Sequence, residues 1–496
     1  MNLTERLKLV VFLLFLTAII IFFGQRKQDF HMDEIANYGL SNHVVGKDAH
    51  IDYGKVHTGL GPFEDFVEVD ATQRFNYRNV YHNQWEDVHP PLYYCIFHTV
   101  CSFFPNSFSI WYGIGLNIFW MWCIVFVLYR LLMLMTQNTY LSLGILLAFC
   151  TTPLFINLIL FIRMYAQLTF VALALAYLIK IYWDKQLDKK FYFFFSVLLL
   201  SGMLTQYYYM FFAFSLCFLF ALHLHFEKRT KEIVTSLIVS GVDALIYLVV
   251  WRHAIKHVFF GYRGEEAMSS AFSLSTIKNV LLMIVSLNIY LFCGLYFIIS
   301  IVLIVVFVKK LRAKSIVFSY EYALVYSAIF YLIAVGKVAP YQHFRYYSPV
   351  AFVFVYAGIV ITSNLLKERF GLKKAVAILV GLCLVANFAG IAASKFYVEM
   401  DFYSEAKAQL FEELEGRTCV IYIDEDWVVP SFFEPVQHAK SYVFLNSDTL
   451  NLVDEYNKPG YVWAIYGEHA DKLPKEIKGK CIYSGSEYYY LIEANN

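Results

Sequence analysis

The chain has 496 residues, of which 59% are hydrophobic and 19% aromatic, whereas only 16% are charged. This composition excludes an ordinary soluble protein of that length and is typical of a protein that resides in lipid. The formal net charge of +1 provides no general basic field, so we do not expect nucleic acid among the partners.

Membrane spans are predicted from apolar length. The first apolar run, residues 7–24, is too long for a signal peptide and has no small-residue exit before Gln25, so we expect a retained anchor. Because a span requires about 20 mainly apolar residues, the whole chain is predicted to be an α-helical polytopic membrane protein with about eleven spans. They lie near residues 7–24, 108–129, 139–160, 164–183, 191–206, 207–224, 233–251, 286–308, 316–336, 345–365 and 374–393.

Basic residues gather in alternate loops, and the positive-inside rule places those loops in the cytoplasm. The amino terminus is then cytoplasmic, whereas the loop over residues 25–107, the loop after Trp251 and the tail from Lys395 are extracytoplasmic. A span miscounted near Thr205 or Ser275 would reverse the orientation of everything downstream. The single glycosylation sequon begins at Asn2 on the cytoplasmic end, which favours a bacterial inner membrane. The basic loop residues are Arg130, Lys180, Lys185, Lys189, Lys190, Lys228, Arg229, Lys231, Lys309, Lys310, Arg312, Lys314, Lys367, Arg369, Lys373 and Lys374.

Two domains are predicted: a transmembrane module over residues 1–394, which includes the first extracytoplasmic loop, and a small extracytoplasmic α/β domain over residues 395–496. The second prediction rests on short β-rich runs at 419–423, 441–445, 461–466 and 488–492. This domain contains no glycine-rich phosphate loop, so no chemistry is assigned to it. Its cysteines, Cys419 and Cys481, are the only pair that we consider for a disulfide.

Adjacent carboxylates, Asp33 and Glu34, follow the first span within about ten residues of the predicted membrane surface. Transfer of a sugar to a hydroxyl or amine requires a carboxylate that removes the proton of the acceptor. A low local dielectric raises the basicity of such a carboxylate. The alternative is a solvated helix start, where both carboxylates favour the amino-terminal dipole.

The first loop ends in the motif Glu86-Asp87-Val88-His89-Pro90-Pro91-Leu92-Tyr93-Tyr94. The double proline restricts the backbone and can start a helix, so it is expected to hold His89 in a fixed place. Glu86, Asp87, His89 and Tyr93 are therefore candidate pocket residues. The alternative is a helix entry with an interfacial aromatic belt.

Two arginines are predicted at outer helix ends. Arg163 follows the third span, next to Tyr165, and Arg345 opens the tenth span beside His343. A guanidinium group offers a planar fork of donors that suits phosphate, although snorkelling to lipid headgroups would explain either residue. We expect these four residues to bind the phosphate of a donor.

The remaining candidates are weaker. The run Gln206-Tyr207-Tyr208-Tyr209 could stack on a sugar, but an interfacial belt explains it more simply. Another outer loop contributes basic residues that could close over a phosphate. Asp243 lies inside the seventh predicted span, where it either fastens helices or relays protons. Several potential metal ligands share the first loop without a fixed spacing, which leaves a divalent metal open. The basic residues are Arg252, His253, His257 and Arg263, and the potential ligands are His31, Asp33, Glu34, His82, Glu86, Asp87 and His89.

Taken together, the motifs resemble the C-type glycosyltransferases, in the branch of the protein O-mannosyltransferases and the bacterial transferase that adds aminoarabinose to lipid A. The resemblance covers roughly residues 7–365, is strongest in the first 170 residues, and excludes the tail. The matching motifs, in order, are Asp33-Glu34, His89-Pro90-Pro91-Leu92-Tyr93-Tyr94, Arg163-Met164-Tyr165-Ala166 and Arg345-Tyr346-Tyr347-Ser348-Pro349.

The resemblance implies a polyprenyl-phosphate monosaccharide donor. It also implies that Asp33 is the catalytic base and that Glu34 helps to position the acceptor or donor. Arg163 and Arg345 would hold the carrier phosphate, and His89 would shape the pocket. The expected activity is inverting transfer to an extracytoplasmic glycan, lipid or protein. A transporter of lipid-linked sugar is the alternative, with Asp243 lining its path, but the hydropathy pattern contains no convincing internal repeat. A non-catalytic assembly protein is a third option.

Overall fold

The computed structural model describes residues 3–27, 30–274, 276–314, 317–340, 343–393, 405–466, 479–484 and 490–494. The predicted sequon at Asn2, the predicted domain boundary at 394/395 and the start of the predicted strand 488–492 lie outside these residues. The chain divides into two compact units. Unit 1 contains Met1–Gly24, Val88–Tyr93 and Ile114–Val398, and unit 2 contains Gln25–Asp87, Tyr94–Gly113 and Glu399–Asn496.

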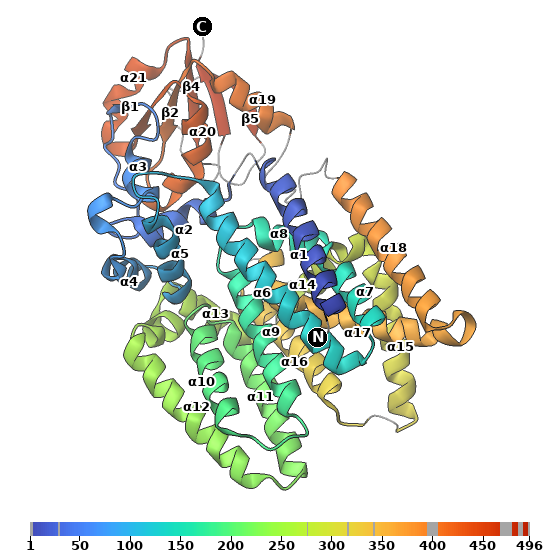
Figure 1. Cartoon of the computed structure of the whole chain (residues 1–496). Coiled ribbons are helices and arrows are strands. Elements are labelled where there is room, and N and C mark those ends of the chain that lie inside the picture. The colour runs from blue at the N-terminus through green and yellow to red at the C-terminus, as the bar shows by residue number, and fades with distance from the viewer. Residues whose placement is uncertain are drawn as a thin grey trace. The chain divides into compact units, whose positions relative to one another are not determined.

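Unit 1 is a bundle of helices (Figure 1). Its apolar sequence places hydrophobic side chains both in the bundle interior and on its lipid-facing surface, as expected for helices dissolved in a bilayer. The helices are α1 (Leu3–Gly24), α6 (Ile110–Thr136), α7 (Thr139–Cys150), α8 (Pro153–Leu160), α9 (Tyr165–Tyr182), α10 (Lys189–Met203), α11 (Tyr209–Phe226), α12 (Thr230–Val250), η2 (Lys256–Phe260), α13 (Tyr262–Phe272), α14 (Ile277–Tyr290), η3 (Phe292–Gly294), α15 (Tyr296–Arg312), α16 (Tyr320–Val338), α17 (Phe344–Phe370) and α18 (Leu372–Ala393).

The expected polytopic helical architecture is confirmed, and the chain is an integral membrane protein. In the described part of the chain, eight helices are long and apolar enough to cross a membrane, namely α1, α6, α9, α11, α12, α16, α17 and α18. Two bent pairs, α7 with α8 at 62° and α13 with α14 at 96°, raise the number to as many as ten. The predicted spans 191–206 and 286–308 overlap α10 and α15, which have only 15 and 17 residues.

The bend inside the predicted span 139–160 has a local cause. Helix α7 ends at Cys150, and α8 begins at Pro153, whose ring cannot continue a preceding helix but suits the first helical position. The side chain of Thr152 caps the new helix by accepting a hydrogen bond of 3.1 Å from the Phe155 N–H. A polar cap and a proline therefore break one apolar run into two helices.

One end of the bundle is fastened by charged and aromatic side chains. The Lys180 Nζ donates to Glu321 Oε1 at 2.7 Å, which joins the end of α9 to the start of α16. Nearby, the rings of Trp183 and His223 stack at 4.2 Å. Because α9 begins at Tyr165, the side chains around Arg163 belong to the opposite end of the bundle.

Unit 2 combines the long loop after α1 with the carboxy-terminal segment, whereas the predicted boundary at 394/395 assigned that loop to the transmembrane module. Figure 1 shows its strands with α20 and α21 beside them. The elements are α2 (Met32–Asn42), β1 (Val56–His57), α3 (Pro62–Val67), η1 (Ala71–Gln73), α4 (Tyr77–Glu86), α5 (Leu92–Ser102), α19 (Glu405–Leu414), β2 (Thr418–Tyr422), η4 (Asp426–Phe432), α20 (Phe433–His438), β3 (Ser441–Leu445), η5 (Ser447–Leu452), α21 (Val453–Tyr456), β4 (Tyr461–Ile465), β5 (Gly479–Ser484) and β6 (Tyr490–Ala494).

The sheet of unit 2 has the strand order β1-β3-β2-β4-β6-β5. Strand β2 pairs in parallel with β3 and β4, and the outer pairs are antiparallel. The central strands are buried on both faces, which is why they read as continuous apolar runs. Val420 and Trp463 belong to the core on one face, and the first loop itself adds the edge strand β1.

The cysteines of the tail are not bonded to each other. Cys419 in β2 is buried, Cys481 in β5 is exposed, and neither is in a disulfide. Two strands, β4 and β6, separate β2 from β5, so the cysteines are about three strand spacings, or roughly 14 Å, apart. A disulfide requires Cα atoms within about 7 Å. The geometry therefore excludes the considered disulfide.

Candidate active site

The segment that contains the predicted catalytic base is the start of α2 in unit 2. His31 is the N-cap residue, and its Nδ1 accepts a hydrogen bond of 3.1 Å from the Asp33 N–H. The His31 N–H in turn donates to Glu34 Oε2 at 3.0 Å. This reciprocal arrangement is a capping box, so the backbone around Asp33 is fixed by its own neighbours.

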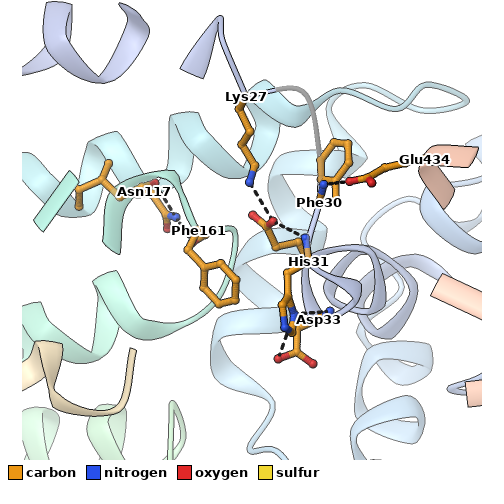
Figure 2. Close-up of polar contacts among 9 residues, drawn as sticks. Lys27, Phe30, His31, Asp33, Asn117, Phe161 and Glu434 are labelled. Carbon is orange, nitrogen blue, oxygen red and sulfur yellow. Dashed lines mark hydrogen bonds and ion pairs between the residues drawn. The ribbon is translucent and has the colours of Figure 1, made fainter. Parts of the chain in front are cut away.

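The two adjacent carboxylates have different environments. Glu34 is fully buried and its Oε2 accepts from Lys27 Nζ at 2.9 Å. The Asp33 side chain is 27% exposed, and its Oδ2 lies 3.6 Å from His31 Nδ1. Figure 2 shows the Asp33 and His31 side chains pointing toward each other. The Glu34 carboxylate therefore stabilises the start of α2, whereas the Asp33 carboxylate is accessible. The alternative of a helix start that favours the dipole applies to both residues but does not explain this difference.

The carboxy-terminal segment also holds this helix start. The Phe30 N–H donates to Glu434 Oε1 (Figure 2), and Glu434 is only 3% exposed. The neighbouring Phe433 ring packs against Phe30, Phe63 and Phe108 at centroid distances of 5.7, 5.3 and 5.0 Å. An aromatic cluster and a charged acceptor from α20 thus position the chain three residues before Asp33.

In unit 1, Arg163 lies in the short connection between α8 and α9. The Asn117 amide donates to the carbonyl groups of Ile159 and Phe161 at 3.0 and 2.8 Å, so a polar side chain of α6 fixes the end of α8. The Arg163 N–H also donates to the Phe161 carbonyl at 2.8 Å. The guanidinium Nη2 lies 3.3 Å from His89 Nε2. Arg163 is therefore a positioned, buried arginine with 3% exposure.

Arg345 begins α17 and is surrounded by aromatic rings. Its guanidinium carbon lies 5.4 Å from the ring centre of Phe161, 6.0 Å from that of Tyr165 and 5.2 Å from that of Tyr346. The His343 ring packs on the same Phe161 ring at 5.9 Å. Cation–π contacts of this kind orient an arginine without neutralising it.

The two arginines therefore meet around one residue. Arg163 contacts the Phe161 backbone, and Arg345 and His343 contact its ring. The structure brings together five of the predicted residues at one end of the bundle: Arg163, Arg345, His343, Tyr165 and His89.

The turn before α11 adds a second aromatic layer. Tyr208 packs on Tyr346 at 5.6 Å. The Tyr207 hydroxyl accepts from Trp251 Nε1 at 2.9 Å and lies 3.0 Å from His257 Nδ1. The aromatic run is therefore an internal support that joins the arginine cluster to η2, and it is not a simple interfacial belt.

Other predicted residues have different surroundings. Tyr93 is fully buried, and Arg263 Nη1 donates to Glu266 Oε2 at 2.8 Å within α13. In unit 2, Glu86 is exposed and accepts from the Lys47 N–H at 3.2 Å, and Asp87 is the C-cap residue of α4. Asp33 and Glu34 also belong to unit 2, so their convergence with the arginines stays a prediction.

Asp243 fastens helices. It is 2% exposed, and its Oδ1 accepts a hydrogen bond of 2.5 Å from Ser196 Oγ, which joins α12 to α10. This contact favours the first of the two roles considered for Asp243.

The described residues do not fit the divalent-metal site that was considered for the first loop. Across the described ranges, no group of three or more His, Cys, Asp or Glu side chains is placed to hold an ion. The His31 ring instead accepts from the Asp33 N–H, and the Glu34 carboxylate accepts from the His31 N–H and from Lys27. No step is therefore assigned to a metal.

Sequence reasoning missed Phe161, Asn117, Lys27 and Glu434 as positioning residues. Phe161 and Lys27 stand beside the motifs in the sequence, so adjacency was the available signal. Asn117 is a polar residue inside an apolar run, which by itself indicates a buried hydrogen bond. Glu434 gives no such signal, because its partner is 404 positions away.

Comparison with protein-family models and with curated proteins finds no match. Among solved structures, ArnT from Cupriavidus metallidurans bound to undecaprenyl phosphate matches with a TM-score of 0.48 and 9% identity, covering 93% of this chain and 97% of ArnT. The archaeal oligosaccharyltransferase AglB from Archaeoglobus fulgidus, in complex with an inhibitory peptide and a dolichol-phosphate, matches with a TM-score of 0.43 and 11% identity, covering 92% of this chain and 70% of AglB.

Proposed function

We propose that this protein is a membrane glycosyltransferase that moves a monosaccharide from a polyprenyl-phosphate donor to an extracytoplasmic acceptor. The observation that carries the proposal is the pair of buried arginines, Arg163 and Arg345, on the backbone and the ring of Phe161. Guanidinium forks match the oxygens of a phosphate. Their position at one end of an apolar bundle suits a ligand whose phosphate is attached to a lipid.

The arginines stabilise the leaving group in this proposal. As the bond between the anomeric carbon and the carrier oxygen breaks, negative charge develops on the lipid phosphate. Two guanidinium groups held by Phe161 and His89 can meet this charge without reorganising, and preorganised stabilisation of this kind usually lowers the barrier more than any other single effect. Aromatic rings of Phe161, Tyr165 and Tyr346 orient the Arg345 guanidinium group.

Asp33 is the base. Its carboxylate is accessible, in contrast to that of Glu34, and the capping box fixes the backbone that carries it. It removes the proton of the acceptor hydroxyl or amine while the acceptor attacks the anomeric carbon and inverts it. The acceptor is a glycan, lipid or protein of the cell envelope. Glu34 then acts by positioning Asp33, not by contact with substrate.

The orientation follows from charge. Lys180 lies in the last turn of α9, at the end of the bundle opposite to Arg163. The positive-inside rule assigns the loops that carry the basic residues, and therefore this end, to the cytoplasm. The arginine cluster then faces outward. We place the protein in a bacterial inner membrane, with a lipid-linked donor because nucleotide sugars are absent outside the cytoplasm.

The test is transfer by purified protein in lipid. Asp33→Asn keeps the size and polarity of the side chain but cannot accept the proton, and loss of a general base costs about a hundredfold to ten-thousandfold in rate. Arg345→Lys keeps the charge but loses the planar fork, so the KM for the donor should rise. Asp448→Asn, an exposed residue of η5, is the matched control and should leave turnover unchanged. Near-normal turnover by Asp33→Asn would remove Asp33 from this role.

A further inference from the structure

An exposed aromatic patch stands out on unit 2. The side chains of Phe103 and Phe104 are 63% and 50% exposed, and those of Phe75 and Tyr77 are 40% and 41% exposed. The four belong to one surface: the Phe75 and Phe103 rings lie 5.5 Å apart, and Tyr77 is fixed by its hydroxyl at 2.9 Å from Thr99 Oγ1. We call these four residues the aromatic patch. Contiguous exposed apolar surface of this kind marks an interaction site.

The backbone holds this patch in an unusual conformation. Phe75 has φ of 60°, a left-handed conformation that a bulky residue other than glycine rarely adopts. The conformation is fixed by two contacts with the end of α5: the Phe75 N–H donates to Ser102 Oγ at 3.0 Å, and Arg74 Nε donates to the Ser102 carbonyl at 2.7 Å. Strain kept in place in this way points to a function of the exposed ring.

The aromatic patch continues directly into a membrane span. The Phe104 ring stacks on the Tyr112 ring at 4.8 Å with an interplanar angle of 9°, and Tyr112 lies in the first turn of α6. Phe104 and Ile110, the first residue of α6, are six positions apart, so the chain permits at most about 20 Å between them. Trp111, 37% exposed, adds a further aromatic residue at this helix start.

The charges next to the aromatic patch suit lipid headgroups. Arg74 and Arg78 are exposed beside it. Asp70 lies in the same turn, but its carboxylate accepts from the Thr72 N–H at 2.7 Å and also from the Thr72 hydroxyl. Aromatic rings with adjacent arginines are the usual composition of a protein surface at the boundary between headgroups and acyl chains.

We propose that the aromatic patch is a membrane-contact surface that seats unit 2 on the phospholipid of the outer leaflet. Lipid is the occupant that the continuity with α6 favours over a second copy of the chain. The patch is also connected to the candidate base: Phe108, in the same connection, packs on Phe30 and Tyr38 at 5.9 and 4.8 Å. The aromatic patch and the segment that carries Asp33 therefore belong to the same packed unit.

The experiment places a photoactivatable analogue, p-benzoylphenylalanine, at single positions of the full-length protein in phospholipid nanodiscs. Position 103 is tested together with position 104, so that a folding defect at one site does not decide the result. Position 126 in α6 is the lipid-facing positive control because Phe126 is 48% exposed in a span, and position 450 in η5 is the negative control because Leu450 is 41% exposed in the sheet region. Adducts are identified by intact mass after illumination.

Positions 103 and 104 are expected to give a mass increase of one phospholipid, as at position 126, with no such adduct at position 450. An adduct with the mass of a second chain would assign the surface to self-association and overturn the proposal. Equal lipid adducts at positions 103 and 450, or none at 103 and 104 while 126 reacts, would also overturn it. None of these outcomes depends on glycosyltransferase activity, so the two proposals fail separately.

Discussion

The guanidinium Nη2 of Arg163 lies 3.3 Å from Nε2 of His89, although 74 positions separate the two residues. Both are anchored independently of each other. The Leu92 N–H, just after the double proline, donates to the Leu204 carbonyl at 3.0 Å, and Phe161 and Asn117 fix the chain beside Arg163. His89 therefore orients an arginine by accepting at Nε2, which requires its proton on Nδ1.

The first prediction separates this role from packing. His89→Gln keeps an acceptor for Arg163 and should retain most of the activity, whereas His89→Leu removes the acceptor and should lower kcat/KM about tenfold, the effect of one net hydrogen bond to a charged group. Steady-state kinetics with varied lipid donor measures both. His82→Gln, at an exposed residue of α4, serves as the control. Equal activity of the Gln and Leu variants would contradict the orienting role.

The helices and central strands of this protein were predictable because their signals are local. An apolar run of span length or a run of buried β-formers identifies its own element, and strands β3 and β4 begin at the residues that the sequence indicated. Bends were not predictable from length alone, since α13 and α14 are each too short to register as a span. The edge strand β1 has two residues and exists only because β3 is there to pair with it.

The candidate site was predictable as a set of motifs but not as a set of contacts. Arg163 and Arg345 were predicted because a guanidinium group suits phosphate, and in the structure both contact Phe161. The partners of the carboxylates could not be read in the same way. Lys27 lies only seven positions before Glu34, but nothing in its residue type shows that it pairs with Glu34 and not with Asp33. Glu434 meets the Phe30 N–H across 404 positions, so no local pattern could indicate that contact.

A second prediction concerns the buried ion pair. Removing one member leaves an uncompensated buried charge, which costs about 3–5 kcal/mol, whereas replacing both members by apolar groups is often close to neutral. Glu34→Leu and Lys27→Met should each destabilise unit 2 by this mechanism, and the double variant should be more stable than either. Chemical unfolding followed by near-ultraviolet circular dichroism measures the difference. A double variant that is as unstable as the sum of the singles would show that the pair is not coupled.

A third prediction concerns Glu434, which accepts from the Phe30 N–H. Glu434→Ala removes the acceptor from a buried donor and should cost about 1–3 kcal/mol, loosening the segment that carries Asp33. Glu434→Gln keeps an acceptor oxygen and should largely restore the amide protection of α2 and the turnover rate. Hydrogen exchange of α2 and kcat are the two measurements. Glu412→Ala, an exposed residue of α19, is the control.

If Glu434 were only a packing residue, the Ala variant would lose global stability without a specific change in α2. Loss of protection confined to residues 30–42, together with a lower kcat and an unchanged KM for the donor, is the expected pattern. Uniform loss of protection across the sheet would contradict the positioning role.

The last prediction is a loss of stability of α2 in acid. His43 ends this helix, and its ring donates from Nδ1 to the Gly46 carbonyl at 2.8 Å and packs on Phe66 at 5.4 Å. Burial lowers the pKa of His43 below its ordinary value of 6.5, and the bond to Gly46 offsets this only in part. The folded state therefore binds fewer protons than the unfolded state once the pH falls below about 6.5. The free energy of unfolding consequently becomes smaller as the pH is lowered through this range.

Hydrogen exchange of α2 should show weaker protection at about pH 5.5 than at about pH 7.5. His43→Gln should flatten this dependence, whereas His50→Gln at an exposed position should not. Protection that is equal at both pH values in the unmodified protein would show that His43 is not the group that titrates.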